Sequence, residues 1–178
     1  MLTTVSRAKD MLGITDDSQD AQIEALIGVG TDAIEAYCRR TFGRATHTEQ
    51  PDQPAGRYLQ LRNYPIIDVT SVARNGGQLK SWTVAKEKGL LERSDWPPEV
   101  TVEYEAGYVL PADATPEAPA NLPRSLEYAC VLFVQYAMRE AGATSVRIGD
   151  LSVTYAQDGA DMPGPVRSLL GPFRSPVS

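Results

Sequence analysis

One segment, residues 122–142, constrains the fold of this chain more than any other, because its apolar residues cover most of a helix surface. At steps of three and four, one face carries Leu126, Ala129, Cys130, Phe133 and Ala137. Much of the remaining surface is covered by Val131, Leu132, Val134 and Met138. A helix that is apolar nearly all round must be buried on several sides. In a chain of 178 residues few elements can supply that cover, so we expect part of this helix to contact another subunit.

The composition indicates a globular protein and excludes some partners. Hydrophobic residues make up 42% of the chain and charged residues 22%, which is typical of a soluble domain. The net charge of −6 argues against tight, sequence-independent binding of nucleic acid, which requires clustered Lys and Arg. No secretory signal is recognisable, and the longest apolar run, 129–134, is far shorter than the roughly 20 residues that span a bilayer. We therefore expect a cytoplasmic protein without a membrane partner.

Two further helices are predicted in the N-terminal part of the chain. Thr3 or Thr4 can cap a first helix that ends at Gly13. A long second helix near residues 18–41 buries one face, at Ile23, Leu26, Ile27, Ile34, Tyr37 and Cys38. Gly28 and Gly30 lie inside this helix, where each costs about 1 kcal/mol relative to Ala. We expect them to permit close approach of the helix at 122–141.

The middle of the chain, residues 44–110, has the character of a β-rich insertion. Short runs with β-branched and aromatic residues alternate with turn residues, which predicts a small antiparallel sheet. Asn75-Gly76 supplies the positive φ angles of a tight hairpin turn, and Pro97-Pro98 must precede the strand that follows them. The proline- and alanine-rich residues 111–120 are predicted to form a linker.

The C-terminal part completes an α+β fold in a single domain, 1–178. Gly149-Asp150 predicts a hairpin turn, Pro165 begins a short helix, and residues 172–178 are expected to form a mobile tail. The predicted architecture is a small helical bundle, with the long helix near 18–41 packed on the helix near 122–141. It carries the inserted sheet, the C-terminal hairpin and the short helix.

The sequence offers no coherent active site. His47 is the only histidine, has no recognisable catalytic partner, and is expected at the surface. Cys38 and Cys130 each lie in a predicted helix; a disulfide is conceivable if those helices pack together, but two buried free thiols fit better. We predict no catalytic residue, no metal site and no cofactor.

Two other classes of function stay open at this point. A β-rich ligand-binding module with helical flanks could use Trp82 and Trp96 in a pocket, although such residues more often pack a sheet. A hydrolase could use carboxylates such as Glu103, but nothing in the sequence fixes the distance between two of them.

Several passages along the chain share their order and spacing with a known family. They are AKDMLGI with the long helix that follows, LRNYPIIDVTSVARNGG, VTVEYEAGYV, LPRSLEYACVLFVQYAMRE, and the closing RIGDLSVTY and VRSLLGPFR. Together they resemble the head–tail connector, or portal-adaptor, proteins of tailed bacteriophages and related prophage or gene-transfer elements. The resemblance implies a structural virion protein rather than an enzyme.

The resemblance also implies partners. Such proteins sit as a ring on the portal protein, commonly in twelve copies, extend the channel for double-stranded DNA, and seat the stopper or tail-completion protein. Twelve copies at −6 each would carry about −72, so that DNA passes without tight binding. The resemblance also implies a location at the portal vertex of the virion, and in the host bacterial cytoplasm during assembly.

Two sets of residues are predicted to make these contacts. Portal docking is assigned to Leu169, Leu170, Phe173 and Arg174, although Leu169 and Leu170 could instead close the subunit core. The helix face with Leu126, Cys130, Phe133 and Ala137 is expected to pack on the helix at 18–41. The opposite face, with Val131, Val134 and Met138, is then left for the sheet or the next subunit.

Overall fold

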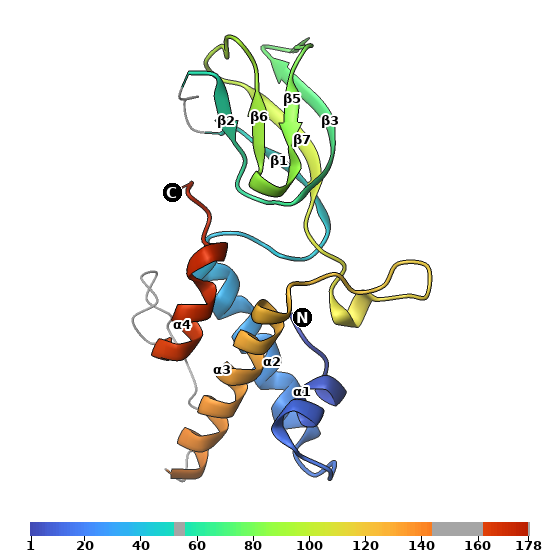
Figure 1. The fold of residues 1–178 in the computed structure, drawn as a ribbon, viewed down its shortest axis with the longest axis vertical. Helices are drawn as coiled ribbons and strands as arrows, with labels where there is room; N and C mark the ends of the chain where they lie inside the picture. The colour runs from blue at the N-terminus through green and yellow to red at the C-terminus, as the bar shows by residue number, and fades with distance from the viewer. Residues whose placement is uncertain (52–55, 144–161, 178) are drawn as a thin grey trace. The chain divides into compact units, whose positions relative to one another are not determined.

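The computed structural model describes residues 1–51, 56–143 and 162–177, with the backbone alone in 140–143. The fold is α+β, as predicted (Figure 1). Its contacts divide the chain into two compact units. A helical unit comprises Met1–Cys38 and Leu110–Arg174, and a β unit comprises Arg39–Val109 together with the C-terminal residues from Ser175. The β unit includes most of residues 44–110, where the sequence predicted an insertion within a single domain; that domain organisation stays a prediction.

The described helical unit contains α-helices and short 3-10 turns. They are α1 (Val5–Leu12), α2 (Asp20–Cys38), η2 (Pro111–Asp113), α3 (Arg124–Ala143), α4 (Gly164–Leu170) and η3 (Gly171–Phe173). The Thr4 hydroxyl accepts a hydrogen bond from the Arg7 amide and caps α1, while Gly13 ends it at a φ of 71°. Both ends agree with the sequence. None of the helices in the described part of the chain combines the length and the hydropathy of a membrane-spanning segment.

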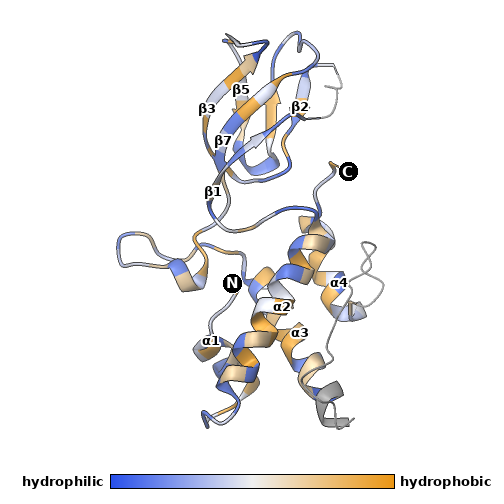
Figure 2. Cartoon of the chain, turned by 180° about the vertical axis from the view of Figure 1, so that it is seen from behind, coloured by the Kyte–Doolittle hydropathy of each residue, from blue (hydrophilic) through white to orange (hydrophobic). Residues whose placement is uncertain are grey.

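Helices α2 and α3 pack closely at Gly30. A Cβ added to Gly30 would lie 2.8 Å from Cδ1 of Phe133 and 3.5 Å from Sγ of Cys130. This is the close approach that the sequence suggested for both glycines of this helix. At Gly28 that expectation is wrong, because an added Cβ would meet nothing within 4 Å. Figure 2 shows how hydrophobic residues concentrate along α2 and α3.

The described β unit contains two antiparallel sheets where the sequence suggested one. The strands are β1 (Ala45–Glu49), β2 (Tyr58–Gln60), β3 (Ile66–Arg74), β4 (Gly77–Gln78), β5 (Thr83–Ala85), β6 (Leu90–Glu92) and β7 (Thr101–Ala106), with a 3-10 turn η1 (Lys86–Lys88). The order is β1-β7-β3-β4 in the first sheet and β2-β6-β5 in the second. The sequence predicted antiparallel strands in this part of the chain but could not assign their long-range partners.

Buried and partly exposed residues alternate along the strands, and the buried ones form the core of the β unit. In β7, Val102, Tyr104 and Ala106 are buried, whereas Glu103 and Glu105 are only half-buried on the other face. Trp96 is 6% exposed in the same core and Trp82 packs against it, which supports a structural role for both.

Turn residues act as the sequence predicted. Asn75 and Gly76, at φ angles of 49° and 79°, join β3 to β4 in a tight hairpin. Pro97 and Pro98 precede β7.

Two predictions concern the C-terminal part. The hairpin expected around Gly149-Asp150 lies outside the described residues. The segment expected to be a mobile tail begins within η3, and Ser175 is 7% exposed. Mobility of the residues after it stays a prediction.

Candidate functional site

A buried polar network, centred on Asn63, ties the first residues of the β unit to its sheet. Asn63 is 6% exposed. Its side-chain oxygen accepts a hydrogen bond from the backbone N–H of Thr41 at 2.9 Å. The backbone N–H of Asn63 donates a hydrogen bond to the Tyr104 hydroxyl at 3.2 Å. Nδ2 of Asn63 lies 3.3 Å from Nδ1 of His47. Buried hydrogen bonds of this kind favour one arrangement of the backbone, although Nε2 of His47 is buried without a hydrogen-bond partner among the described residues.

His47 belongs to this network and is not a surface residue, so that expectation was wrong. The ring is half-buried, with its centroid 5.5 Å from that of Tyr104. Burial lowers the pKa of His47, which favours the neutral imidazole. Because β1 pairs with β7, the histidine faces Tyr104 in register. Sequence alone could not reveal that pairing.

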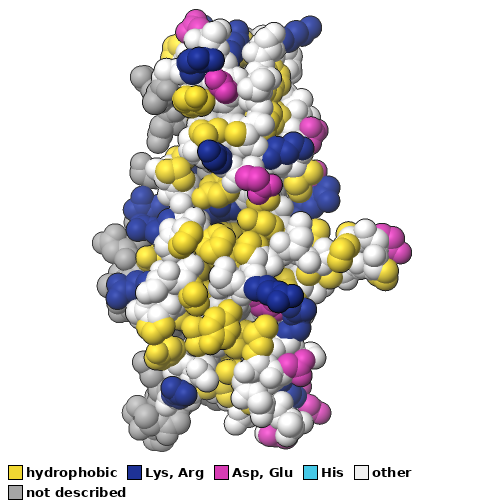
Figure 3. Space-filling view, viewed as in Figure 1, with side chains coloured by type: hydrophobic (Ala, Val, Ile, Leu, Met, Phe, Trp, Pro, Cys, Tyr) yellow, Lys and Arg dark blue, Asp and Glu magenta, His cyan; other side chains and the backbone are white. Residues whose placement is uncertain are grey.

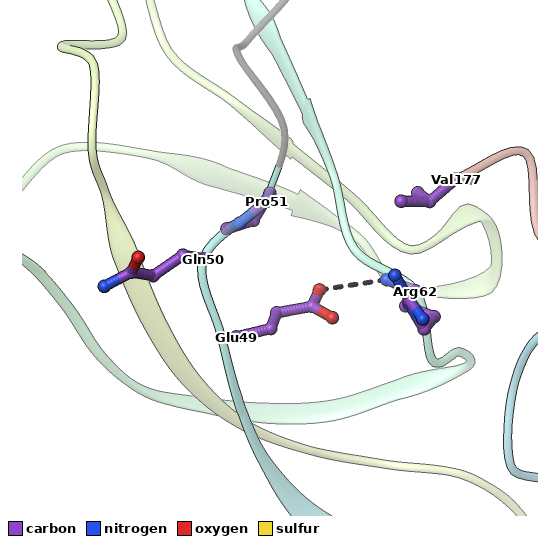
Figure 4. A pocket seen from close by; sticks show the side chains of 5 residues that line it. All are labelled: Glu49, Gln50, Pro51, Arg62 and Val177. Carbon is purple, nitrogen blue, oxygen red and sulfur yellow. Dashed lines mark hydrogen bonds between the residues drawn. The ribbon is translucent and has the colours of Figure 1, made fainter.

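Glu49 extends the network into a pocket of about 270 Å³ lined by Glu49, Gln50, Pro51, Arg62 and Val177 (Figure 4). The Glu49 carboxylate accepts a hydrogen bond from the Arg62 amide at 2.9 Å and another from the Tyr104 hydroxyl. Burial raises the pKa of Glu49, and burial also raises the pKa of Tyr104 to about 12. Among the described residues of this lining, Glu49 is the one carboxylate and there is no nucleophile.

Other side chains that could take part in chemistry are also hydrogen-bonded or buried. The Glu103 carboxylate, considered for a hydrolase, accepts a hydrogen bond from the Ser71 hydroxyl at 3.4 Å. Cys38 and Cys130 are buried thiols that form no disulfide, as predicted, and burial raises the pKa of Cys130 to about 12. The described residues contain no group of three or more His, Cys, Asp or Glu that could hold a metal.

A nearly buried carboxylate anchors the N-terminal segment to α3. Glu127 is 3% exposed and binds Arg7 through two bonds, of 2.5 Å from Nε and 2.7 Å from the terminal nitrogen. Its Oε1 also accepts a bond from the Thr3 hydroxyl at 3.1 Å. The hydrogen bond from Arg7 holds the pKa of Glu127 below its ordinary value.

The predicted portal-docking residues divide into two groups. Leu170 is fully buried, which agrees with the alternative that it closes the subunit core. Leu169 and Phe173 are half-buried and Arg174 is exposed, with its guanidinium 4.9 Å from the ring centroid of Tyr37. The structure thus leaves accessible surface on Leu169, Phe173 and Arg174.

The predicted subunit-interface residues also differ from one another. Val131 is 2% exposed and Val134 is fully buried in the single chain, whereas Met138 is half-buried. Their contact with a neighbouring subunit stays a prediction.

The surface of α3 that faces outward is a stripe of aromatic and basic residues that the sequence analysis did not identify. Tyr128 is 47% exposed, and Leu132 and Tyr136 follow at steps of four with half-buried side chains. Arg124 and Arg139 are exposed at the two ends of the stripe. Figure 3 shows hydrophobic side chains gathered over α3 on this face. The four-residue spacing of Tyr128, Leu132 and Tyr136 could have indicated this face in the sequence. Because apolar residues also occupy the other faces of the helix, the spacing did not show which face is accessible.

Comparison with known proteins supports the resemblance proposed from the sequence. The family model described as "Head completion protein" matches residues 1–175. A solved structure described as "Neck of empty GTA particle computed with C6 symmetry" is similar at 14% identity and a TM-score of 0.58, covering 98% of this chain and 90% of the other. Another, "Neck of native GTA particle computed with C12 symmetry", has 16% identity and a TM-score of 0.55, covering 96% and 87%. No curated protein matches this chain.

Proposed function

Because the chain belongs to the head completion protein family, we propose that it forms a ring on the portal vertex of a phage-like particle. There it extends the DNA channel and provides the seat for the stopper or tail. The family match over residues 1–175 carries this proposal. Family membership also makes the chain a structural, head–tail connector protein and not an enzyme.

The ring is proposed from the similar structures and from the surfaces of this chain. The similar structures are those of particle necks computed with C6 and C12 symmetry. We propose twelve copies here, placed in the virion at the head–tail junction after assembly in the host cytoplasm. A closed ring of one chain requires two different complementary surfaces on each subunit. Such a ring needs no catalytic centre, cofactor or metal.

The charge of the chain suits a channel through which DNA slides. At −6 per chain, a ring repels the phosphate backbone on average and offers few sites for counterion release. We therefore expect passing DNA to be guided and not held.

Portal docking is proposed for Leu169, Phe173 and Arg174, at the end of α4 and in the turn that follows. An apolar group beside an accessible arginine is a common anchor at protein interfaces. Leu170 supports this surface from the core and is not itself proposed to touch the portal.

Electron microscopy of the protein mixed with its portal tests this function. We expect an added ring of density on one end of the portal. The double variant F173S/R174E should fail to bind the portal, while R74E, a change at an exposed arginine of the β unit, should bind normally. Portal particles without added density in the wild-type mixture would refute the proposed function. Normal binding of F173S/R174E would refute only the docking assignment.

A further inference from the structure

We propose that the outward stripe of α3 binds the outward surface of α2 in a second copy of this chain. This inference rests on the proposed ring and specifies the two surfaces through which neighbouring subunits join. The α3 stripe comprises Arg124, Tyr128, Leu132, Tyr136 and Arg139.

The composition of the α3 stripe is that of a protein interface. Tyrosine and arginine are enriched among the residues that dominate binding energy, because each combines a large contact area with a polar group. Tyr128 is 47% exposed, and Leu132 and Tyr136 on the same line of the helix are partly accessible to water. The described part of this face, between Arg124 and Arg139, carries no carboxylate.

A complementary surface exists on α2 of the same unit. One line of its exposed positions follows the helical repeat and carries small or acidic side chains, at Ala21, Glu24, Ala25, Asp32 and Ala36, while the exposed Gln22 lies beside this line. Gly28 lies among them, with open space where its side chain would be. A glycine in a helix is less favourable than an alanine. At Gly30 this cost allows the Phe133 ring to pack closely, whereas at Gly28 no close contact of the described residues explains it. Because most of these α2 side chains are small, the surface has room for the rings of Tyr128 and Tyr136 from the α3 stripe.

The two surfaces lie on opposite sides of the α2–α3 pair. Gly30 of α2 meets Cys130 and Phe133 of α3 where the helices pack. At 100° per residue, Gly28 and Asp32 point away from that contact, and so does the α3 stripe around Tyr128. One surface on each side is the arrangement that heterologous contacts need to build a ring.

Charge complementarity identifies a second copy as the partner. The α3 stripe presents Arg124 and Arg139, whereas the outward surface of α2 presents Glu24 and Asp32. Opposite charges favour this pairing, and like charges disfavour α3 against α3 or α2 against α2. The contact is therefore directional, with each subunit receiving one neighbour on α3 and another on α2.

Charge exchange between two variants tests the pairing. R124E/R139E reverses the α3 stripe and E24K/D32K reverses the α2 surface. In each variant alone, every contact should weaken about tenfold, which corresponds to about 1.4 kcal/mol per contact, so that mixing it with portal should give almost no rings. An equimolar mixture should restore rings, because alternating subunits would then pair opposite charges at every contact.

A second pair of variants removes the aromatic contact without a change of charge. Y128A should reduce ring formation, whereas Y58A, at a 50% exposed tyrosine of the β unit, should not. As a control, circular dichroism and thermal melting establish whether each variant is folded before its ring formation is compared. Rings formed by R124E/R139E alone at the wild-type level would overturn this inference, as would failure of the equimolar mixture to assemble. Failure of the wild-type protein to form rings on portal would instead refute the proposed function.

Discussion

The two glycines of α2 predict stability changes of opposite sign for the same substitution. Gly28→Ala should stabilise the protein by up to about 1 kcal/mol, because Ala has the higher helix propensity and the new methyl group meets nothing within 4 Å. Gly30→Ala gains the same propensity, but its Cβ would lie 2.8 Å from Cδ1 of Phe133. That separation is too short for two carbon atoms, so the ring or the helix must move.

Packing around Phe133 sets the size of the difference. Phe133 is 9% exposed, so its ring has little room to turn away. Inserting a methyl group into a packed core costs typically about 1–3 kcal/mol. The propensity gain is common to both variants and cancels, which leaves G30A less stable than G28A by about 1–3 kcal/mol.

Urea unfolding followed by circular dichroism at 222 nm measures this difference. The midpoint should rise for G28A and fall for G30A relative to wild type, with unchanged slopes. Gly30→Ala combined with Phe133→Leu should recover part of the loss, since the smaller side chain makes space for the methyl group. Equal midpoints for G28A and G30A would refute the close packing of α2 on α3.

Two further predictions concern buried polar groups. Glu127→Gln should lower the unfolding free energy at pH 7 by about 1–3 kcal/mol, because the bidentate bond to Arg7 is lost. The folded pKa of Glu127 is depressed, so its contribution is fully present above the unfolded value and is lost as pH falls through the folded one. Urea midpoints of wild type and E127Q should therefore converge below about pH 4, and a constant gap down to pH 2 would contradict the assignment. Tyr104→Phe should destabilise the β unit by about 1–3 kcal/mol through the unmade bonds to Asn63 and Glu49, whereas Tyr58→Phe, at an exposed position, should change the melting temperature little. Equal melting temperatures for the two variants would show that the network does not hold the unit together.

Local signals in the sequence were sufficient for most elements of the fold. Capping by Thr4, the stop at Gly13 and the Asn75-Gly76 turn each depend on the conformation of a few neighbouring residues. These preferences act before long-range contacts form. Helix α3 was equally clear, because its length and apolar content fit no other element.

Long-range partners were beyond the sequence. The division into two sheets depends on β2 pairing with β6, across 30 residues, and nothing in either strand specifies that partner. His47 was misplaced for the same reason, because only the pairing of β1 with β7 puts its ring beside Tyr104. The family resemblance predicted the class of function but not which side of α3 is accessible. That surface became visible once burial separated Val131 and Val134 from Tyr128.

The mass of the complex formed with purified portal, determined by native mass spectrometry, tests the central proposal most directly. Twelve chains of 19.3 kDa should add about 230 kDa to each portal in one cooperative step, as closure of a symmetric ring requires. Portals that gain no mass, or that gain one or two chains without completing a ring at excess protein, would contradict the account.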